Sequence, residues 1–499
     1  MSEDRDSVAH VDDEGLSAAD IKERASRGVV TMGLRGVATR ALGLVGNIVL
    51  ARMLVPADFG ALAFGFSVIV FATVISSGGL GASLVRRARP PTRRDLESIF
   101  GFQLAIMLVA LAVIAAVGAF GGRAGALATI MAISLPIDAF RVPGAVMAER
   151  ALAFGVIARA EVLEITAYTV AAIAAVLLGF GVWGVAAAAI VRAVAGSVSL
   201  VRFRGIGVVR PRLSGAFLRE NGRFGLSFQS VSIVALVRDQ GFNVIIAAVG
   251  GLAMLGYWAI ATRLLQALVL LFESLWRVAY PAMARLAEID GDAEAVLDRS
   301  LRLAALAAGA IVVILSGTAP ALVTTLFGAR WHDSATILPL AGLGALIAGP
   351  TSACATGYLS AAREVGTIVR AAGAQTVVLL AAGVPLLSLF GALGLGITWL
   401  AGSIVYWAIL SRAVRRIAGV SVPRATWRST LLAAIACVPA YAVASSVTPA
   451  PLALLAAAVV GEALYFSASF VVCRPQLRHI SRLAWRAVPV RGVPVRSAA

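Results

Sequence analysis

The chain has 499 residues, of which 60% are hydrophobic and 14% charged, and its formal net charge is +17. A soluble globular domain has about 25% charged residues, so this composition excludes the soluble class. In a soluble protein the positive charge would suggest a nucleic-acid partner. Here the basic residues lie beside long apolar stretches, where anionic lipids attract them, so the predicted partner is membrane lipid and not nucleic acid.

Apolar stretches dominate the chain from residue 28 to residue 473, and each is long enough for a helix across a ~30 Å hydrocarbon core. The predicted spans are 28–51, 59–85, 97–120, 124–147, 158–180, 182–203, 224–249, 253–283, 300–327, 335–362, 365–389, 391–414, 427–447 and 451–473. Residues 1–27 are predicted to be a disordered cytosolic tail with a short helix, and residues 474–499 a basic cytosolic tail. The predicted fold is an all-α polytopic membrane protein with about fourteen transmembrane helices.

Arginine-rich connections alternate with connections that carry almost no charge. The arginines gather at 86–94, 202–223, 412–428 and 474–496. Basic residues accumulate on the cytoplasmic side of membrane proteins. The alternation therefore predicts a multi-pass protein of the bacterial cytoplasmic (inner) membrane with both termini in the cytoplasm, the bacterial assignment depending on the family resemblance given below.

The first six spans resemble the next six. Arg27-Gly28 and Arg223-Phe224 open the first and the seventh span 196 residues apart, and the same offset superposes Phe59-Gly60 on Leu255-Gly256. A second match relates residues 155–160 to residues 366–371. Because six is even, both halves enter the membrane from the same side, which indicates parallel repeats about an axis along the membrane normal. The predicted domains are an N-lobe (28–203), a cytoplasmic linker (204–223), a C-lobe (224–415) and two extra C-terminal helices (427–473).

Residues 40–60 resemble the opening of oligosaccharide flippases of the Wzx type, which belong to the multidrug/oligosaccharidyl-lipid/polysaccharide exporter superfamily. Further matching stretches are 78–86, 179–184, 255–258 and 280–286, and the similarity runs from residue 28 to about residue 415. One departure is Arg238-Asp239, where the family resemblance implies a lone polar residue in the seventh span.

The resemblance implies alternating access between the two lobes. The implied cargo is a polyprenyl-pyrophosphate-linked oligosaccharide, moved from the cytoplasmic to the outer leaflet for surface polysaccharide assembly. A polysaccharide polymerase and chain-length machinery are further expected partners. The histidines and cysteines show no metal-ligand spacing and the chain has no P-loop, so no metal, no cofactor and no enzymatic activity are predicted.

Charged residues inside the spans are the candidates for the site. A charge in the bilayer interior costs at least ~2.5–3.5 kcal/mol on insertion scales, so it lines a cavity or has a partner. A guanidinium binds phosphate oxygens with two parallel hydrogen bonds, and amides serve a sugar. The predicted substrate-binding residues are Arg35, Arg40, Asn47, Arg238, Arg263 and Gln266. We expect Arg40 and Arg263 to face a shared cleft, and Asn47 to share a helix face with Arg40.

Carboxylates inside the spans are candidates for a proton or sodium relay. These are Glu161, Glu164, Asp239 and Glu273. The alternative for each is a structural ion pair, with Arg238 beside Asp239 and with Arg141 or Arg159 within reach of the two fifth-span glutamates.

Four other functions compete with a lipid-linked oligosaccharide flippase. A drug or metabolite–cation antiporter of the same superfamily would favour acidic residues at mid-depth, and a lipid II flippase is a closer variant. A membrane glycosyltransferase or polymerase would need a large loop outside the membrane, whereas the longest internal connection here has about twenty residues. A scaffold for envelope assembly would make the buried arginines dispensable.

Overall fold

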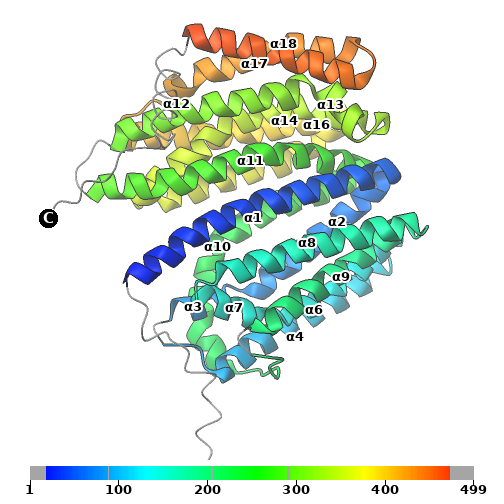
Figure 1. Cartoon of the computed structure of the whole chain (residues 1–499), viewed down its shortest axis with the longest axis vertical. Helices are drawn as coiled ribbons and strands as arrows, with labels where there is room; N and C mark the ends of the chain where they lie inside the picture. The colour runs from blue at the N-terminus through cyan, green and yellow to red at the C-terminus, as the bar shows by residue number, and fades with distance from the viewer. Residues whose placement is uncertain (1–17, 88, 204–205, 289–292, 473–499) are drawn as a thin grey trace, which may run out of the picture. The chain divides into compact units, whose positions relative to one another are not determined.

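The computed structural model describes residues 18–87, 89–203, 206–288 and 293–472 (Figure 1), and within these ranges every regular element is a helix. The predicted tail at 474–499 and most of the tail at 1–27 lie outside the described residues. Clustering of contacts gives two compact units. The first holds the described residues up to Gln266 with Leu326–Ile337 and Ala372–Gly402, and the second holds Ala267–Thr325, Leu338–Ala371 and the described residues from Ser403 onward. The predicted lobe boundaries follow repeat symmetry and not contacts, so they stay a prediction.

The first unit begins with a long helix and continues through a series of shorter ones. Its elements are α1 (Ala18–Met53), α2 (Pro56–Ser77), α3 (Leu80–Arg86), α4 (Arg93–Gly118), α5 (Gly122–Ala132), α6 (Ser134–Ala139), α7 (Val142–Arg150), α8 (Phe154–Leu177), α9 (Gly181–Val201), α10 (Gly215–Ile245), the π-helix η3 (Ile246–Gly250), α11 (Gly251–Glu288) as far as Gln266, the 3₁₀-helix η5 (Ala329–Trp331), α14 (His332–Pro350) as far as Ile337, and the Ala372–Gly402 part of α16 (Val365–Ala418). Within this unit α1 lies along α8, and α8 lies along α9 (Figure 1).

Local sequence signals set where these helices begin and end. The Thr92 hydroxyl accepts a hydrogen bond from the Asp95 amide, and the Asp95 carboxylate accepts one from the Thr92 amide, so a capping box starts α4. Pro56 occupies the first turn of α2, where its missing N–H costs nothing. Gly78 and Gly79 have φ of 49° and 66°, a left-handed conformation that ends α2 and lets α3 start in a new direction.

Two long helical stretches are sharply broken inside. α16 (Val365–Ala418) has 54 residues, which would be about 80 Å at 1.5 Å per residue and far exceeds a bilayer. Gly391 breaks it with φ 55° and ψ −130°, at the predicted boundary between two spans. Gly251, with φ 79°, likewise separates α10 and η3 from α11.

The number of spans is not fixed by helix length and composition alone. Among the described residues ten helices are long and apolar enough to cross a membrane, or eleven when Gly122–Ala139 and Val142–Arg150, bent by 51°, count as one broken span. The chain is therefore a multi-pass membrane protein. The count of fourteen stays a prediction, because that total treats each broken stretch as two spans and includes α1.

The contact between α2 and α11 repeats itself. A Cβ on Gly60 would lie 1.6 Å from the carbonyl oxygen of Leu252, and a Cβ on Gly256 would lie 2.1 Å from that of Pro56. These two residue pairs are related by the 196-residue offset of the internal repeat. Gly60 thus packs against the residues around Gly256, and Gly256 packs against the residues around Gly60. Two-fold symmetry between the repeats produces such a contact between equivalent residues, so the contact supports the duplicated architecture.

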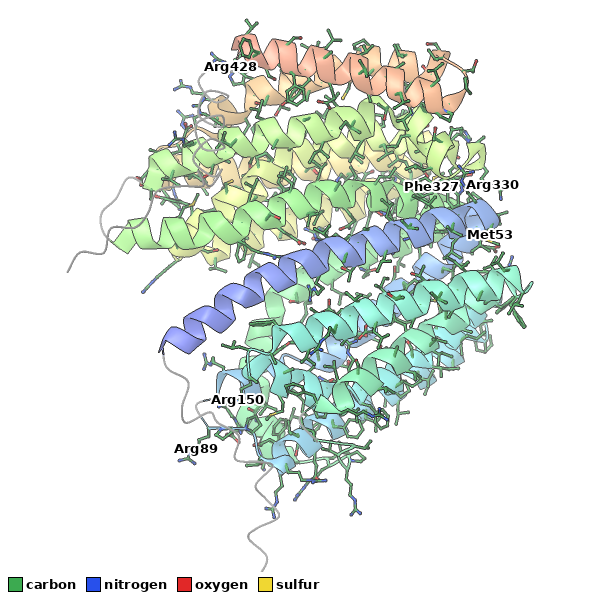
Figure 2. The ribbon with its side chains drawn as sticks, in the orientation of Figure 1. Met53, Arg89, Arg150, Phe327, Arg330 and Arg428 are labelled. Carbon is green, nitrogen blue, oxygen red and sulfur yellow. The ribbon has the colours of Figure 1, made fainter. Side chains whose placement is uncertain are left out.

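The end of α1 is held by the segment that contains η5 within the first unit. The Trp331 indole donates to the Ala51 carbonyl (3.0 Å), and its ring meets Phe59 edge-on with centroids 5.2 Å apart. The Arg52 Nε donates to the Leu326 carbonyl (2.9 Å). Figure 2 shows Met53, Phe327 and Arg330 gathered at this end.

The second unit contains the remaining helices. They are the rest of α11, α12 (Ala293–Val312), the π-helix η4 (Val313–Gly317), α13 (Ala319–Leu326) as far as Thr325, the rest of α14 from Leu338, the π-helix η6 (Thr351–Ala355), α15 (Thr356–Ala361), the ends of α16, α17 (Val422–Ser446) and α18 (Ala450–Val472). α17 and α18, the two predicted extra spans, lie side by side (Figure 1) and pack on α12. The Tyr465 hydroxyl fixes this packing by donating to the Leu306 carbonyl (2.8 Å).

Candidate functional site

A cavity of about 320 Å³ lies inside the first unit between α1, α2, α8, α9 and α11. Its polar lining consists of Asn47, Tyr168, Thr169, Arg192 and Arg263, one or two from each of four helices. The rest of its lining is aliphatic, aromatic or glycine, and no carboxylate is among the described residues that line it. The cavity is therefore a cationic site with hydrogen-bonding groups in an otherwise apolar wall.

Close packing of α1 on α8 forms one wall of the cavity. A Cβ on Gly46 would lie 2.7 Å from the Thr169 methyl carbon, so only glycine allows this approach of the two helices. The Phe66 and Tyr168 rings meet edge-to-face with centroids 5.8 Å apart, which orients the Tyr168 side chain. The Asn47 amide donates to the Gly43 carbonyl one turn earlier (2.7 Å).

The two cavity arginines come from different helices. Arg192 lies roughly 16 Å along α9 and Arg263 roughly 18 Å along α11, at 1.5 Å per residue, so both are deep in their spans. Both interact electrostatically with Tyr168. Guanidinium groups deep in a membrane span need an anionic partner or water, and this cavity leaves Arg263 accessible to one.

The structure brings two of the six predicted substrate residues into the cavity, Asn47 and Arg263. Arg40 is not among the lining residues, and its guanidinium turns back along α1 toward Gly36, away from Asn47. Gln266 lies on α11 one turn beyond Arg263 and outside the lining. The expected shared cleft of Arg40 and Arg263 stays a prediction.

The other predicted arginines are held by carboxylates. Arg35 donates to Glu161 (2.8 Å). Arg238 binds Asp239 through two hydrogen bonds of 2.7 and 3.1 Å and also reaches Gln375 at 3.5 Å. The pairing alternative stated above for Asp239 is thus what the structure shows, and Glu161 is paired with Arg35.

The relay candidate Glu273 lies in the second unit, where its carboxylate is 3.8 Å from the Arg277 guanidinium one turn later on α11. The other three candidates, Glu161, Glu164 and Asp239, lie in the first unit.

Glu164 belongs to a buried charge cluster beside the cavity. Arg141 donates to its carboxylate at 2.6 Å and lies 3.9 Å from Asp138. The carboxylate rests on α9, where a Cβ on Gly196 would lie 2.2 Å from its Oε1. The Asp138 Oδ1 is buried without a hydrogen bond among the described residues. Arg192, one turn from Gly196, interacts electrostatically with both acids and so connects the cluster with the cavity.

Glu164→Gln is expected to lower stability more than Glu161→Gln. The Glu164 side chain is 11% exposed and that of Arg141 34% exposed, so removing the carboxylate leaves a half-buried guanidinium without its closest partner, which costs about 1–3 kcal/mol. The Glu161 side chain is 39% exposed and its pair is worth about 1 kcal/mol at most. Thermal unfolding of the two variants in detergent measures the difference. Equal melting temperatures would show that the cluster adds no stability, and Arg141→Met with Glu164→Leu should recover part of the loss.

Sequence reasoning missed Arg192 and Tyr168. Arg192 is a lone charge in the middle of the predicted span 182–203, a signal as strong as the one that singled out Arg40. Tyr168 gives no comparable signal, because a tyrosine in an apolar span is ordinary; only its ring contact with Phe66 and its electrostatic interaction with both cavity arginines distinguish it.

Comparisons with known proteins agree with this architecture. A family model described as "Polysaccharide biosynthesis protein" matches residues 49–336. The succinoglycan biosynthesis transport protein ExoT of Rhizobium meliloti (strain 1021) is 25% identical over 320 residues, which are 62% of this chain and 63% of that relative's length.

Two solved structures share the fold. The lipid II flippase MurJ in an inward closed conformation superposes with a TM-score of 0.71 at 13% identity, over 89% of this chain and 99% of that one. An inward-facing multidrug resistance MATE transporter of the MOP superfamily superposes with a TM-score of 0.54 at 16% identity, over 79% and 99% of the two chains. The predicted exporter-superfamily fold is confirmed. Since the family model covers more than half of the sequence, the chain belongs to the polysaccharide biosynthesis protein family.

Proposed function

We propose that this protein is a flippase that moves a polyprenyl-pyrophosphate-linked oligosaccharide from the cytoplasmic to the outer leaflet by alternating access, during surface polysaccharide assembly. The observation that carries the proposal is the cavity in the first unit, which offers two arginines and, among its described lining residues, no carboxylate. The family and the name of the relative from Rhizobium meliloti support a transporter in polysaccharide biosynthesis and not an enzyme.

The cavity chemistry suits the head group of such a lipid. Arg192 and Arg263 would replace the hydration of the pyrophosphate with fixed donors, and a planar guanidinium matches two phosphate oxygens at once. Asn47, Tyr168 and Thr169 would bond the adjoining sugar. A volume of about 320 Å³ is at the lower end for ligand pockets, which fits the pyrophosphate with its first sugar and not a whole oligosaccharide.

The coupling of transport to a proton or sodium ion stays a proposal. Glu161, Glu164 and Asp239 are each held by an arginine, and Glu273 faces Arg277, so an ion would have to compete with a guanidinium. Glu164 is the best placed of these acids, because it packs on α9 near Arg192.

The same-fold alternatives make different demands. A drug or metabolite–cation antiporter needs an anionic site, which the lining of this cavity does not offer. A lipid II flippase would also bind a pyrophosphate, and the fold of MurJ is shared. Complementation separates the two, because a lipid II flippase restores growth of cells depleted of their own, whereas the proposed flippase restores only surface polysaccharide.

Transport itself is tested by reconstitution. A fluorescent polyprenyl-pyrophosphate oligosaccharide is placed in proteoliposomes, and an impermeant quencher reports the fraction that reaches the outer leaflet with time. The proposal expects exchange that depends on the protein, and no exchange for a fluorescent phosphatidylcholine. Protein-dependent movement of phosphatidylcholine at the same rate would contradict a dedicated flippase.

The proposed orientation, with both termini in the cytoplasm of the inner membrane, is tested by cysteine labelling in intact cells. Thr92 and Ser214 cap α4 and α10 and are left unchanged. Cysteines are placed instead at the nearby exposed residues Pro90 and Leu213. Both are expected to resist an impermeant thiol reagent, because they flank arginine-rich connections. Cysteines at Phe120 and Pro451, also exposed, should react. Reversed labelling would invert the topology.

A further inference from the structure

A second hollow lies on the first unit between α6 and α9, with a volume of about 260 Å³. Ile137 and Phe140 form one side, Val198 and its neighbours on α9 form the other, and Arg202 and Val208 lie at one end. It shares no lining residue with the cationic cavity. This hollow is called the α6–α9 groove below.

The groove is apolar along its length. Among its described lining residues, the one polar side chain between its ends is Ser197, whose hydroxyl donates to the Ile137 carbonyl at 2.6 Å and is therefore satisfied within the protein. Val198 is 50% exposed on the groove side of α9. Such a surface on a spanning helix offers nothing to water and faces hydrocarbon, so a lipid chain is the fitting occupant.

The walls are fixed before any lipid binds. The Phe140 ring packs against Phe100 of α4 with centroids 5.0 Å apart. α7 rests on the backbone of α9, where a Cβ on Gly144 would lie 2.1 Å from the Leu200 carbonyl oxygen. The groove therefore presents a preformed shape to the membrane, which reduces the ordering cost of binding.

Residues 207–212 lie at the end of the groove, where Val208 lines it. The Gly207 amide donates to the Val201 carbonyl (3.1 Å), with Gly207 in the left-handed region at φ 66°. Further along, the Arg212 amide donates to the Glu97 carbonyl on α4 (3.0 Å). The segment is thus tied at both ends, and Val208 between them is 65% exposed at the groove.

Arg202 gives the groove its charge. It is the C-terminal cap residue of α9, it is exposed, and among the described residues it forms no salt bridge. A guanidinium at the end of a span lies at the level of lipid phosphates, and basic pockets between helices on the cytoplasmic side bind anionic head groups.

We propose that the α6–α9 groove is a specific site for one anionic glycerophospholipid, with an acyl chain in the groove and the phosphate on Arg202. The position of Arg202 at a helix end favours a resident phospholipid over the polyprenyl cargo, whose pyrophosphate is assigned to arginines deep in the spans. The proposal does not depend on the flippase function.

Native mass spectrometry of the purified full-length protein tests the site. The protein is delipidated in detergent and then supplied with equal amounts of phosphatidylglycerol and phosphatidylcholine that carry the same acyl chains. One phosphatidylglycerol should stay bound to the wild type. Arg202→Gln should lower its retention by about fivefold, the value of one arginine near a membrane surface. Val198→Phe, which fills the groove, should also lower the retention of phosphatidylglycerol.

Arg424→Gln is the matched control, since Arg424 is an exposed arginine near the start of α17 that lines neither the α6–α9 groove nor the cationic cavity. It should retain phosphatidylglycerol like the wild type. Equal loss in Arg202→Gln and Arg424→Gln would show diffuse attraction and overturn the site, as would full retention in Arg202→Gln. Recovery of a polyprenyl phosphate as the tightly bound lipid would overturn the choice of occupant. Melting temperatures of all variants confirm that they are folded.

Discussion

Arg263→Gln is expected to lower surface polysaccharide by about 10- to 100-fold while the amount of protein in the membrane stays normal. Glutamine keeps a hydrogen-bonding group in the cavity but removes the charge, and a hydrogen bond to a charged group is worth about 1.5–3 kcal/mol. Arg192→Gln should have a similar effect on export. Arg263→Lys should recover part of it, because lysine keeps the charge but loses the fork that binds two oxygens. The measurement is surface polysaccharide normalised to membrane protein.

Arg159→Gln is the control for charge removal alone. Arg159 is exposed in the second turn of α8, donates to the Gly155 carbonyl and is not among the described residues that line the cavity, so its replacement should leave export unchanged. Arg40→Gln tests whether Arg40 contacts the cargo during transport. A loss of export at normal protein abundance would place Arg40 on the path of the cargo, although Arg40 lies outside the cavity lining. Normal export by both Arg192→Gln and Arg263→Gln would contradict the cationic site.

Gly256→Ala should destabilise the protein by about 1–3 kcal/mol or more, because its Cβ would meet the Pro56 carbonyl at 2.1 Å and overpacking of this kind forces backbones apart. Gly60→Ala should have an effect of the same size, since its Cβ would meet the Leu252 carbonyl in the equivalent way. The double variant should lose less than the sum, because one separation of α2 from α11 accommodates both methyl groups. Melting temperatures in detergent supply the three values.

Gly373→Ala is the matched control for this series. Gly373 lies within α16 and a Cβ there would meet nothing within 4 Å. In that setting alanine is neutral or stabilises a helix by about 1 kcal/mol. Effects no larger than that of Gly373→Ala would show that the close approach of α2 and α11 has no energetic weight. Strict additivity of the Gly60 and Gly256 effects would show instead that the two methyl groups are accommodated independently.

The class of fold was predictable because only helices and closed β-barrels satisfy their backbone hydrogen bonds in lipid, and stretches of about 20 apolar residues indicate helices. Breaks at Gly251 and Gly391 fell at predicted boundaries, since a change of direction needs a residue that tolerates positive φ. The repeat at 59–60 and 255–256 was visible as a sequence offset. The contact between these residues could not be predicted, because the sequence offset does not say where the symmetry axis passes.

The site was only partly predictable. Depth along a helix can be counted from the sequence, and this identified Arg263 and Asn47. The direction in which a side chain points around its helix depends on how the helices pack. So does the choice of the residue with which the side chain pairs. Arg40 turns along its own helix toward Gly36, and Arg35 meets Glu161 on a helix more than one hundred residues later. Such contacts are made by tertiary structure, and a single sequence does not encode them in any local pattern.

The meeting of Gly60 with Gly256 also bears on the origin of the protein. Before duplication, the two glycines would have been one residue of a half-length chain, and their contact would have been the centre of a homodimer of two such chains inserted in the same direction. Fusion would then have freed the two copies to diverge, as Arg263 and its equivalent Ser67, 196 residues earlier, illustrate, while Gly60 and Gly256 still face each other. Two co-expressed halves, divided within residues 204–223, are therefore expected to find each other in the membrane as the ancestral subunits did.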